Sequence, residues 1–119
     1  MDQSLPRVLR IRRGSEIRQI LKNGRRFTGE HLTLICLTAP EAPGAARAGF
    51  LSPRRIGHAT ERNRARRRLR DLFRTHRAAF RAPNQILFMG RPSTATASFE
   101  ALRAEFLRLC RMARLLPDA

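Results

Sequence analysis

Six arginines fall within nine residues, positions 62–70, in the segment ERNRARRRLRDLF, and no acidic residue lies among them. A guanidinium group stays charged at physiological pH, and its planar fork of donors fits phosphate oxygens. Like charges at this density destabilise a folded chain unless an outside group supplies negative charge. The cluster therefore predicts a surface that binds a polyanion.

The composition points to nucleic acid as that polyanion. The chain has 25 basic and 9 acidic residues, a net charge of +16, and Lys22 as its only lysine. Arginine contacts phosphates and stacks on bases, so its dominance favours nucleic acid over a merely solvated surface. A GC-rich genome would also shift lysine to arginine, but it would not explain the sign of the net charge. A hydrophobic fraction of 42% is too high for a disordered basic tail, so this chain should fold.

Asn63 is the one amide inside the arginine cluster. Its acceptor and donors suit a ribose hydroxyl, a base edge or a hydrated metal ion held by phosphates. An asparagine near a helix start also often hydrogen-bonds to the backbone. The sequence leaves both interpretations open.

The residues that could hydrolyse RNA are scattered. Nuclease chemistry needs a carboxylate cluster that binds metal, or a positioned general acid and base. The 9 acidic residues form no close pair that would converge, and His31, His58 and His76 lie far apart in the sequence. We therefore expect no catalytic residue and no metal site in the protein itself.

The length and the cysteines indicate one small intracellular domain. The 119 residues fit a single domain over 1–119, and we expect residues 1–14 and 115–119 to be flexible ends. Cys36 and Cys110 lie in apolar surroundings, as inert core thiols do in a reducing compartment. No stretch approaches the ~20 apolar residues of a membrane span, and the N-terminus lacks the apolar core of a signal peptide. We expect a cytoplasmic protein with no membrane partner.

The elements before the cluster follow from hydrophobic periodicity. Ser15 can cap a helix over EIRQILKN, which Gly24 would end in a left-handed conformation. Residues 31–38 are almost all apolar or β-branched, which predicts a strand covered on both faces. RRFTG before it predicts a short strand, and ARAGFLS after it is interpreted as a neighbouring strand. The strands outnumber the hairpin signals between them, so the sequence alone leaves their pairing order open.

The cluster itself belongs to a long central helix. This helix is predicted to begin near His58 or Thr60 and to run to about Arg81, because Pro83 blocks its continuation. Residues 85–90, QILFMG, are wholly apolar apart from their ends and predict a buried central strand.

A last helix completes the domain, with Ser98 as its N-cap. Its predicted core face holds Phe99, Leu102, Phe106, Leu109 and Ala113. The order helix, strands, helix, strand, helix predicts an α+β class or a split βαβ unit, with the helices packed on one small central sheet.

A helical wheel of the central helix does not place its arginines opposite its apolar face. The apolar face holds Leu69, Leu72, Phe73, His76 and Phe80. Continued towards the N-terminus, this stripe meets Arg62, with Arg66 and Arg70 beside it, while Arg64, Arg67 and Arg68 point elsewhere. An ordinary solvated face would lie opposite the apolar stripe and alternate in sign. We therefore expect this half to overhang the core between polyanion surfaces, with guanidinium groups replacing apolar groups on its sheet-facing side.

The segment GFLSPRRIGHATERNRARRRLRDLFR resembles the signature region of the protein subunit of bacterial ribonuclease P. That signature is an Arg-Asn-Arg core followed by a basic pair and an apolar run. LRIRRGSEIRQILKNGRRFTGEHLTLICL is similar to the family's first helix and strands, and QILFMGRP with SFEALRAEFLRLCR to its last strand and helix. The resemblance implies a small α+β, ribosomal-protein-like two-layer fold with a left-handed βαβ crossover. It also implies that the protein assists a catalytic RNA in the Mg²⁺-dependent removal of the 5′ leader from precursor tRNA.

The resemblance further implies which residues bind which RNA. The catalytic RNA would contact Arg54, Arg55, Arg62, Asn63, Arg64, Arg66, Arg67, Arg68 and Arg70. The leader would lie in a cleft between the sheet and the first helix, lined by Ile17, Leu21, Phe27, Phe50 and Ser52. The catalytic RNA and its Mg²⁺ would perform the hydrolysis, and no DNA partner is expected.

The sequence departs from the family pattern at two places. Ile17 and Leu21 stand where many members have aromatic side chains, and an aliphatic group lacks the face on which a base stacks for about 1–3 kcal/mol. Ser52-Pro53-Arg54-Arg55 replaces the usual Ser-Lys-Lys. The charge is retained, but Pro53 lacks an amide donor and should end the strand there.

Two other classes share the basic helix. A ribosomal protein or RNA chaperone would also carry it on a small sheet, but would not stimulate precursor tRNA processing. A DNA-binding regulator would need a helix-turn-helix pair, whereas here strands flank the basic helix.

Overall fold

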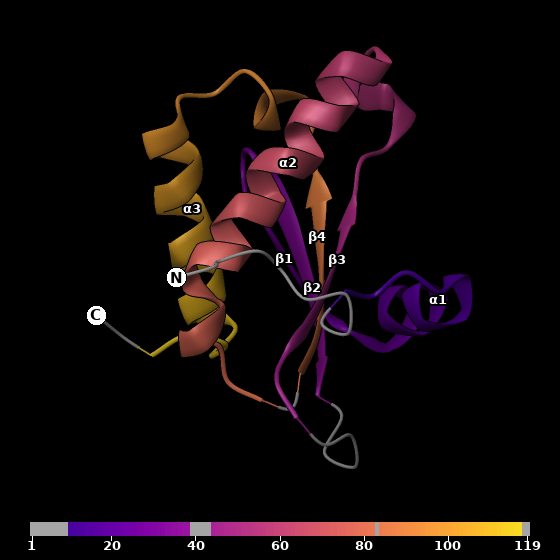
Figure 1. Cartoon of the computed structure of the whole chain (residues 1–119), viewed down its shortest axis with the longest axis vertical. Coiled ribbons are helices and arrows are strands. Elements are labelled where there is room, and N and C mark those ends of the chain that lie inside the picture. The colour runs from indigo at the N-terminus through magenta and orange to yellow at the C-terminus, as the bar shows by residue number, and fades with distance from the viewer. Residues whose placement is uncertain (1–9, 39–43, 83, 118–119) are drawn as a thin grey trace.

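A mixed four-stranded sheet carries α2 and α3 on one face and α1 on the other in the computed structural model of the chain (Figure 1). The structure describes residues 10–38, 44–82 and 84–117. The elements are α1 (Gly14–Asn23), β1 (Arg25–Thr28), β2 (Leu32–Thr38), β3 (Arg47–Leu51), α2 (Ala59–His76), β4 (Asn84–Gly90) and α3 (Phe99–Met112). Short 3₁₀ turns occupy Arg54–Ile56, Arg77–Ala79 and Pro92–Thr94. The predicted α+β class and order of elements are confirmed.

The strand order is β1-β2-β4-β3. β2 pairs antiparallel with β1 and β4, whereas β3 runs parallel to β4. The predicted buried central strand is confirmed, since Ile86, Leu87 and Phe88 of β4 are fully buried. The prediction that β3 is the neighbour of β2 is wrong. The strongly apolar β4 lies between them, where both its edges are paired and both its faces are covered.

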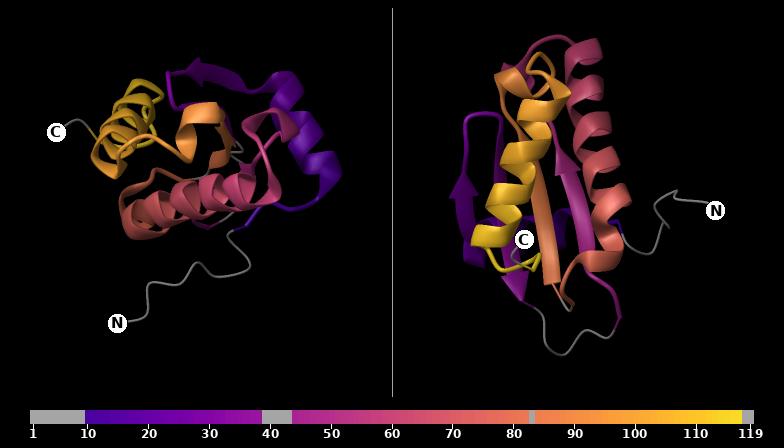
Figure 2. Two further views of the ribbon diagram at one scale, coloured as in Figure 1. Left: turned by 90° about the horizontal axis from the view of Figure 1, so that it is seen from above. Right: turned by 90° about the vertical axis from the view of Figure 1, so that its left-hand side faces the viewer.

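The connection from β3 through α2 to β4 is a left-handed crossover. The two strands are parallel, and Figure 2 (right) shows β4 to the left of β3, with α2 on the viewer's side of the sheet. Roughly 98% of such crossovers are right-handed, so this feature is distinctive. It places α2 along the β3 edge of the sheet and leaves the rest of that face to α3.

The main core lies between the sheet and helices α2 and α3. Phe88 of β4 stacks on Phe106 of α3 with ring centroids 5.1 Å apart, and Phe73 of α2 lies 5.8 Å from the Phe88 ring. On the opposite face, Ile20 of α1 packs with Ile35 of β2. Because β2 and β4 are covered on both faces, they are apolar along almost their whole length.

Both ends of α1 differ from the prediction. The helix begins at Gly14 with Arg13 as N-cap, so Ser15 does not cap it. Gly24 is extended, with φ of −76°, and not left-handed. Glycine is still needed at this position, because a Cβ would lie 2.6 Å from the Ile20 carbonyl oxygen and 2.8 Å from Ile35 Cγ2.

Helix α2 ends at His76, earlier than the predicted Arg81, and a 3₁₀ turn follows. The early end lets Phe80 turn back into the core, where its ring centroid lies 4.9 Å from that of Phe73. His76 is half-buried, and its Nδ1 lies 2.9 Å from the Leu72 carbonyl oxygen. Pro83, expected to block the helix, lies outside the described residues.

Helix α3 has the predicted cap but not the whole predicted face. The Ser98 hydroxyl accepts a hydrogen bond from the Ala101 N–H at 3.1 Å, which confirms the cap. Phe99 is 45% exposed, so its placement in the core is wrong. It is the first residue of α3, and its ring faces Arg68, whose guanidinium carbon is 5.9 Å from the ring centroid.

The described parts of the two segments expected to be flexible are packed. Ile11, Leu115 and Leu116 are buried, and the Ile11 N–H donates to the Ala48 carbonyl at 2.7 Å. The flexibility of the two segments stays a prediction. Residues 1–9 and 118–119 lie outside the described part of the chain.

Glu105 of α3 ties the β1–β2 turn to the helix layer. Its buried carboxylate accepts hydrogen bonds from the N–H groups of Glu30, His31 and Leu32 at 2.7, 2.7 and 2.9 Å. The sequence assigned no role to this residue. These charge-assisted bonds satisfy three backbone donors at the β1–β2 turn.

We expect Glu105→Gln to lower the free energy of unfolding by about 2 kcal/mol, because an amide offers one oxygen to three donors and turns its own NH₂ towards them. Urea denaturation followed by circular dichroism measures this change. Glu100→Gln, exposed on the same helix, is the control and should cost no more than about 0.5 kcal/mol. Equal stability of the two variants would contradict the role of Glu105.

Candidate nucleic-acid interface

The arginine-rich half of α2 extends past the end of β3 at one end of the domain (Figure 1). Together with the 3₁₀ turn that precedes α2, it forms a basic region that we call the arginine surface. The arginine surface consists of Arg54, Arg55, Arg62, Arg64, Arg66 and Arg67. Arg62 and Arg66 are half-buried and the other four are exposed. Two adjoining segments therefore present their guanidinium groups at one end of the molecule.

A turn that favours glycine joins these two segments. β3 ends at Leu51, as Pro53 predicted, and Pro53 then precedes the 3₁₀ turn. Gly57 has a φ of 143°, which side chains rarely adopt, and a Cβ there would collide with the carboxylate of Glu61. Gly57 therefore fixes where the chain enters α2.

The sheet-facing side of α2 stays apolar at the level of the arginines. Ala65 is fully buried and packs with Ile56 beside Gly90 of β4. The expectation that guanidinium groups replace apolar groups on this side is therefore wrong. Ala65 continues the buried apolar face of α2, and Arg62 and Arg66 lie on either side of that face. Because alanine is small, the helix approaches the sheet closely at this point.

No carboxylate compensates the arginine surface within residues 10–38, 44–82 and 84–117. The arginine ion pairs there join Arg47 to Glu16, Arg74 to Asp71 and Arg108 to Glu105. None of these arginines belongs to the arginine surface. Its positive charges therefore repel one another until a polyanion lies against them.

Asn63 lies within this basic region and contacts one of its arginines. Its Oδ1 accepts a hydrogen bond from Nη2 of Arg66, one turn later in α2. Of the two interpretations left open by the sequence, the structure shows the acceptor bound to a side chain and not to the backbone. A hollow of about 430 Å³ is lined by Thr60, Asn63, Arg64, Arg67 and Arg68.

Arg68 differs from its neighbours because it binds inside the protein. Its Nη1 donates to the carbonyl oxygens of Thr94 and Ala97 at 2.9 and 2.7 Å. Burial, and then the charge of Arg64, lower the pKa of Arg68 below its ordinary value. The side chain holds α2 against the segment that leads into α3, so we leave it out of the arginine surface.

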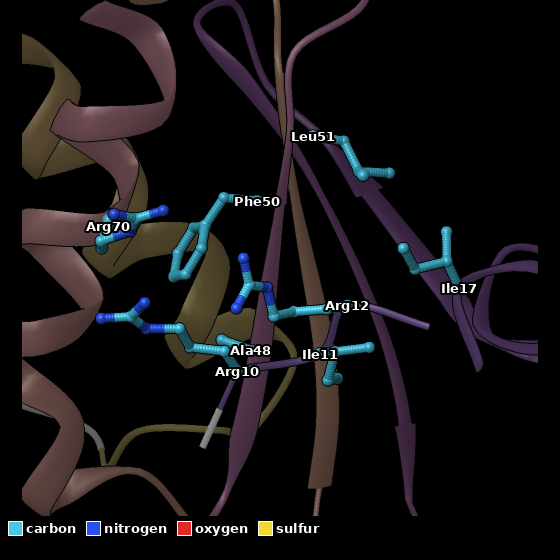
Figure 3. Close-up of a pocket in the computed structure, with 8 residues that line it drawn as sticks. All are labelled: Arg10, Ile11, Arg12, Ile17, Ala48, Phe50, Leu51 and Arg70. Atoms are coloured by element: carbon cyan, nitrogen blue, oxygen red, sulfur yellow. The ribbon is translucent and has the colours of Figure 1, made fainter. Parts of the chain in front are cut away.

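A second hollow, which we call the Phe50 hollow, lies between α2 and the β3 edge (Figure 3). It has a volume of about 230 Å³. Arg10 and Arg12 enter from the segment that pairs with Ala48 of β3, and Arg70 enters from α2. Figure 3 shows the three guanidinium groups gathered near the Phe50 ring.

The electrostatics of this hollow favour an anion. Burial first, and then the charges of Arg10, Arg66 and Arg12, lower the pKa of Arg70 below its ordinary value. Positive charges from several arginines therefore lie close to one another at this hollow. The Arg70 guanidinium carbon also lies 5.8 Å from the Phe50 ring centroid, so charge and an aromatic face adjoin.

The predicted leader cleft is not lined by all five predicted residues. Ile17 and Leu21 pack on the α1 face of the sheet, whereas Phe27 and Phe50 pack on the core side with α2 and α3. Ser52 donates its hydroxyl to a backbone carbonyl of α2 at 2.8 Å and so anchors that helix. Of the five, Ile17 and Phe50 line the same hollow. Phe27 is separated from them because it lies on β1, at the other edge of the sheet.

Sequence reasoning missed other residues beside this site. Leu51 and Met89 are half-buried on the α1 face, and with Ile17 and Leu21 they form what we call the apolar patch. Side chains two residues apart on a strand share a face, so the alternation along β3 and β4 could have indicated Leu51 and Met89. That inference requires the strand order, which the sequence did not provide. Arg12, in the Phe50 hollow, had no local signal at all.

The histidines lie at separate places. Nδ1 of His31 is 2.7 Å from the Ser93 hydroxyl, His76 contacts a carbonyl of its own helix, and His58 directly precedes α2. In the part of the chain that the structure describes, no three His, Cys, Asp or Glu side chains gather to hold a metal ion. Nor does any described helix have the length and apolar character needed to span a bilayer.

A small α+β domain with an arginine surface of this kind is typical of the class of basic nucleic-acid-binding domains. Comparison with known proteins is more specific. The family model described as ribonuclease P matches residues 5–114. The chain belongs to the ribonuclease P protein family, as the resemblance implied.

Individual relatives agree. A ribonuclease P protein component from Desulfovibrio desulfuricans is 40% identical over 120 residues, which cover 97% of this chain and 91% of the relative. That of Acidothermus cellulolyticus is 38% identical over 105 residues, or 88% of each chain. The Staphylococcus aureus RNase P protein structure has a TM-score of 0.82 at 18% identity, covering 92% of this chain and 98% of that one. The structure of the Thermotoga maritima RNase P protein has a TM-score of 0.74 at 23% identity, and the match covers 86% of this chain and 96% of that one. These two structures match the fold.

We expect the neighbours Arg67 and Arg68 to differ when each is replaced by alanine. Arg68→Ala should lower the free energy of unfolding by about 2 kcal/mol, because it leaves two carbonyl groups without their donor. Arg67→Ala should leave stability within about 0.5 kcal/mol and weaken RNA binding. Chemical denaturation and filter binding on both variants measure this. Equal stability of the two would contradict the internal role of Arg68.

Proposed function

We propose that this chain is the protein subunit of a ribonuclease P holoenzyme and binds the catalytic RNA through the arginine surface. The observation that supports this most is the charge of that surface, whose six guanidinium groups have no carboxylate partner in the described ranges. A folded RNA presents closely spaced phosphates that would compensate them. Asn63 adds an uncharged amide with donors for a ribose hydroxyl or a base edge.

In this proposal, the 5′ leader of precursor tRNA crosses the apolar patch and the Phe50 hollow. A single strand offers both phosphates and unpaired bases. The hollow offers guanidinium groups that would bind a phosphate. The Phe50 ring stacks on Phe88 and has Arg70 over it, and a base of the leader would extend this stack outwards. This path replaces the predicted cleft and keeps Ile17, Leu21 and Phe50 of its five residues.

The chemistry would be performed by the RNA. The described side chains form no carboxylate cluster that fits a metal ion, so the Mg²⁺ for hydrolysis would be held by the catalytic RNA. The protein would screen the repulsion between two RNAs and hold the leader, both of which raise the affinity for precursor tRNA. We propose that the protein alone does not cleave RNA and that it works in the cytoplasm.

The two other classes are less well supported. A ribosomal or RNA-chaperone role would explain the arginine surface, but family membership favours ribonuclease P. A DNA-binding regulator would present a helix-turn-helix pair, whereas α2 lies between β3 and β4 in the chain.

The test is reconstitution with a bacterial ribonuclease P RNA and a precursor tRNA at low Mg²⁺. We expect the protein to stimulate release of the leader severalfold or more, because phosphate repulsion is then least screened by the metal. Protein without RNA should release none. Cleavage by the protein alone, or no stimulation at any Mg²⁺ concentration, would contradict the proposal.

We expect Arg12→Gln and Arg70→Gln each to weaken holoenzyme binding of precursor tRNA by about 5-fold at 0.1 M salt, since each removes one phosphate contact. Binding of tRNA without a leader should not change. Arg18→Gln, an exposed arginine of α1 outside the hollow, is the control with the same loss of charge. If the two variants weakened the binding of precursor tRNA and of tRNA without a leader equally, these arginines would contact something other than the leader.

A further inference from the structure

A second group of arginines lies at the other end of the domain. Arg81, Arg111 and Arg114 line a hollow of about 440 Å³, together with Met112 and Leu116. Figures 1 and 2 show the C-terminal end of α3 beside the last turn of α2, whereas the arginine surface lies at the first turns of α2. His76 ends α2 nine residues after Arg67, so about 14 Å of helix lies between the arginine surface and this end of α2.

The backbone holds these arginines in place. The Arg81 N–H donates to the Leu115 carbonyl at 2.8 Å, which joins the end of the α2 region to the turn after α3. In that turn, the Leu115 N–H donates to the Cys110 carbonyl at 2.9 Å and the Arg114 N–H to the Arg111 carbonyl at 3.0 Å. This is a Schellman motif, with Arg114 at its left-handed position.

Arg114 is an unusual residue for that position. Its φ is 60°, and no other residue except glycine has a positive φ in the described part of the chain. Glycine is the common choice there because a Cβ makes the left-handed conformation costly. An arginine therefore adds a positive charge to this hollow at a cost in stability.

The charges of this hollow also lack a partner. Within the described ranges, no carboxylate forms an ion pair with Arg81, Arg111 or Arg114. The buried Nε of Arg111 has no hydrogen-bond acceptor there. Three guanidinium groups around one concave site provide convergent donors for a tetrahedral anion.

We propose that this hollow binds a backbone phosphate of RNA, so that the domain contacts RNA at both ends. The proposal rests on the function proposed above, which supplies the RNA. The phosphate could belong to the catalytic RNA or to precursor tRNA, and the two are separated by experiment. The protein would then bridge two RNA segments instead of coating one.

The test compares the full-length variant Arg81→Gln/Arg114→Gly with the control Arg18→Gln/Arg103→Gln. Both lose two positive charges, and the control residues are exposed and lie outside both hollows. Glycine relieves the left-handed position, so the melting temperature should be unchanged or higher. One arm measures binding of ribonuclease P RNA, and the other measures binding of precursor tRNA by the holoenzyme.

We expect the double variant to bind about 5- to 8-fold more weakly than the control in one arm at 0.1 M salt, because the loss of one phosphate contact accounts for a factor of that size. The affected arm identifies the RNA. If wild-type protein binds and stimulates but the two variants bind alike in both arms, the second site is overturned and the proposed function stands. If wild-type protein neither binds ribonuclease P RNA nor stimulates release of the leader, the second site and the proposed function are both overturned.

Discussion

Burial of the C-terminal half of α2 is the constraint on which the basic interface depends. Leu69, Leu72 and Phe73 are almost completely buried, and each contributes about 1.5–3 kcal/mol. Neighbouring guanidinium groups in water repel by only about 1 kcal/mol per close pair, and salt screens that further. The apolar anchor therefore outweighs the repulsion, and the arginine half of the same helix keeps its position without an RNA partner.

The rest of the fold positions this helix. The left-handed crossover sets α2 along the β3 edge, where Arg70 meets the segment that carries Arg10 and Arg12. Ser52 and Gly57 fix the entry of the chain into α2. The internal bonds of Arg68 then hold the helix against the segment before α3, so one arginine of the cluster supports the presentation of the others.

The sequence identified those features that depend on local patterns. The apolar run of β4, the Ser98 cap and the exposed arginines of α2 were all predictable from composition and periodicity. The strand order was not, because the pairing of β3 with β4 is decided by burial across the whole sheet. The error at Phe99 has a similar cause, since a helical wheel gives the direction of a side chain but not what packs against it.

The candidate site was predicted in part for the same reason. A wheel shows which side of α2 a residue is on, but not that Arg68 would reach two carbonyl groups of another segment. The family resemblance placed Ile17 and Phe27 in one cleft, yet they lie on opposite faces of the sheet. Arg12 became visible as a site residue only when the structure placed it beside Phe50.

The central claim, that uncompensated arginines at one end of α2 bind RNA phosphates, is tested most directly by the salt dependence of binding. The dissociation constant of protein and ribonuclease P RNA is measured over a range of monovalent salt concentrations. Six phosphate contacts predict that log affinity falls with log salt at a slope of about −4 to −5. A slope near zero would contradict the claim.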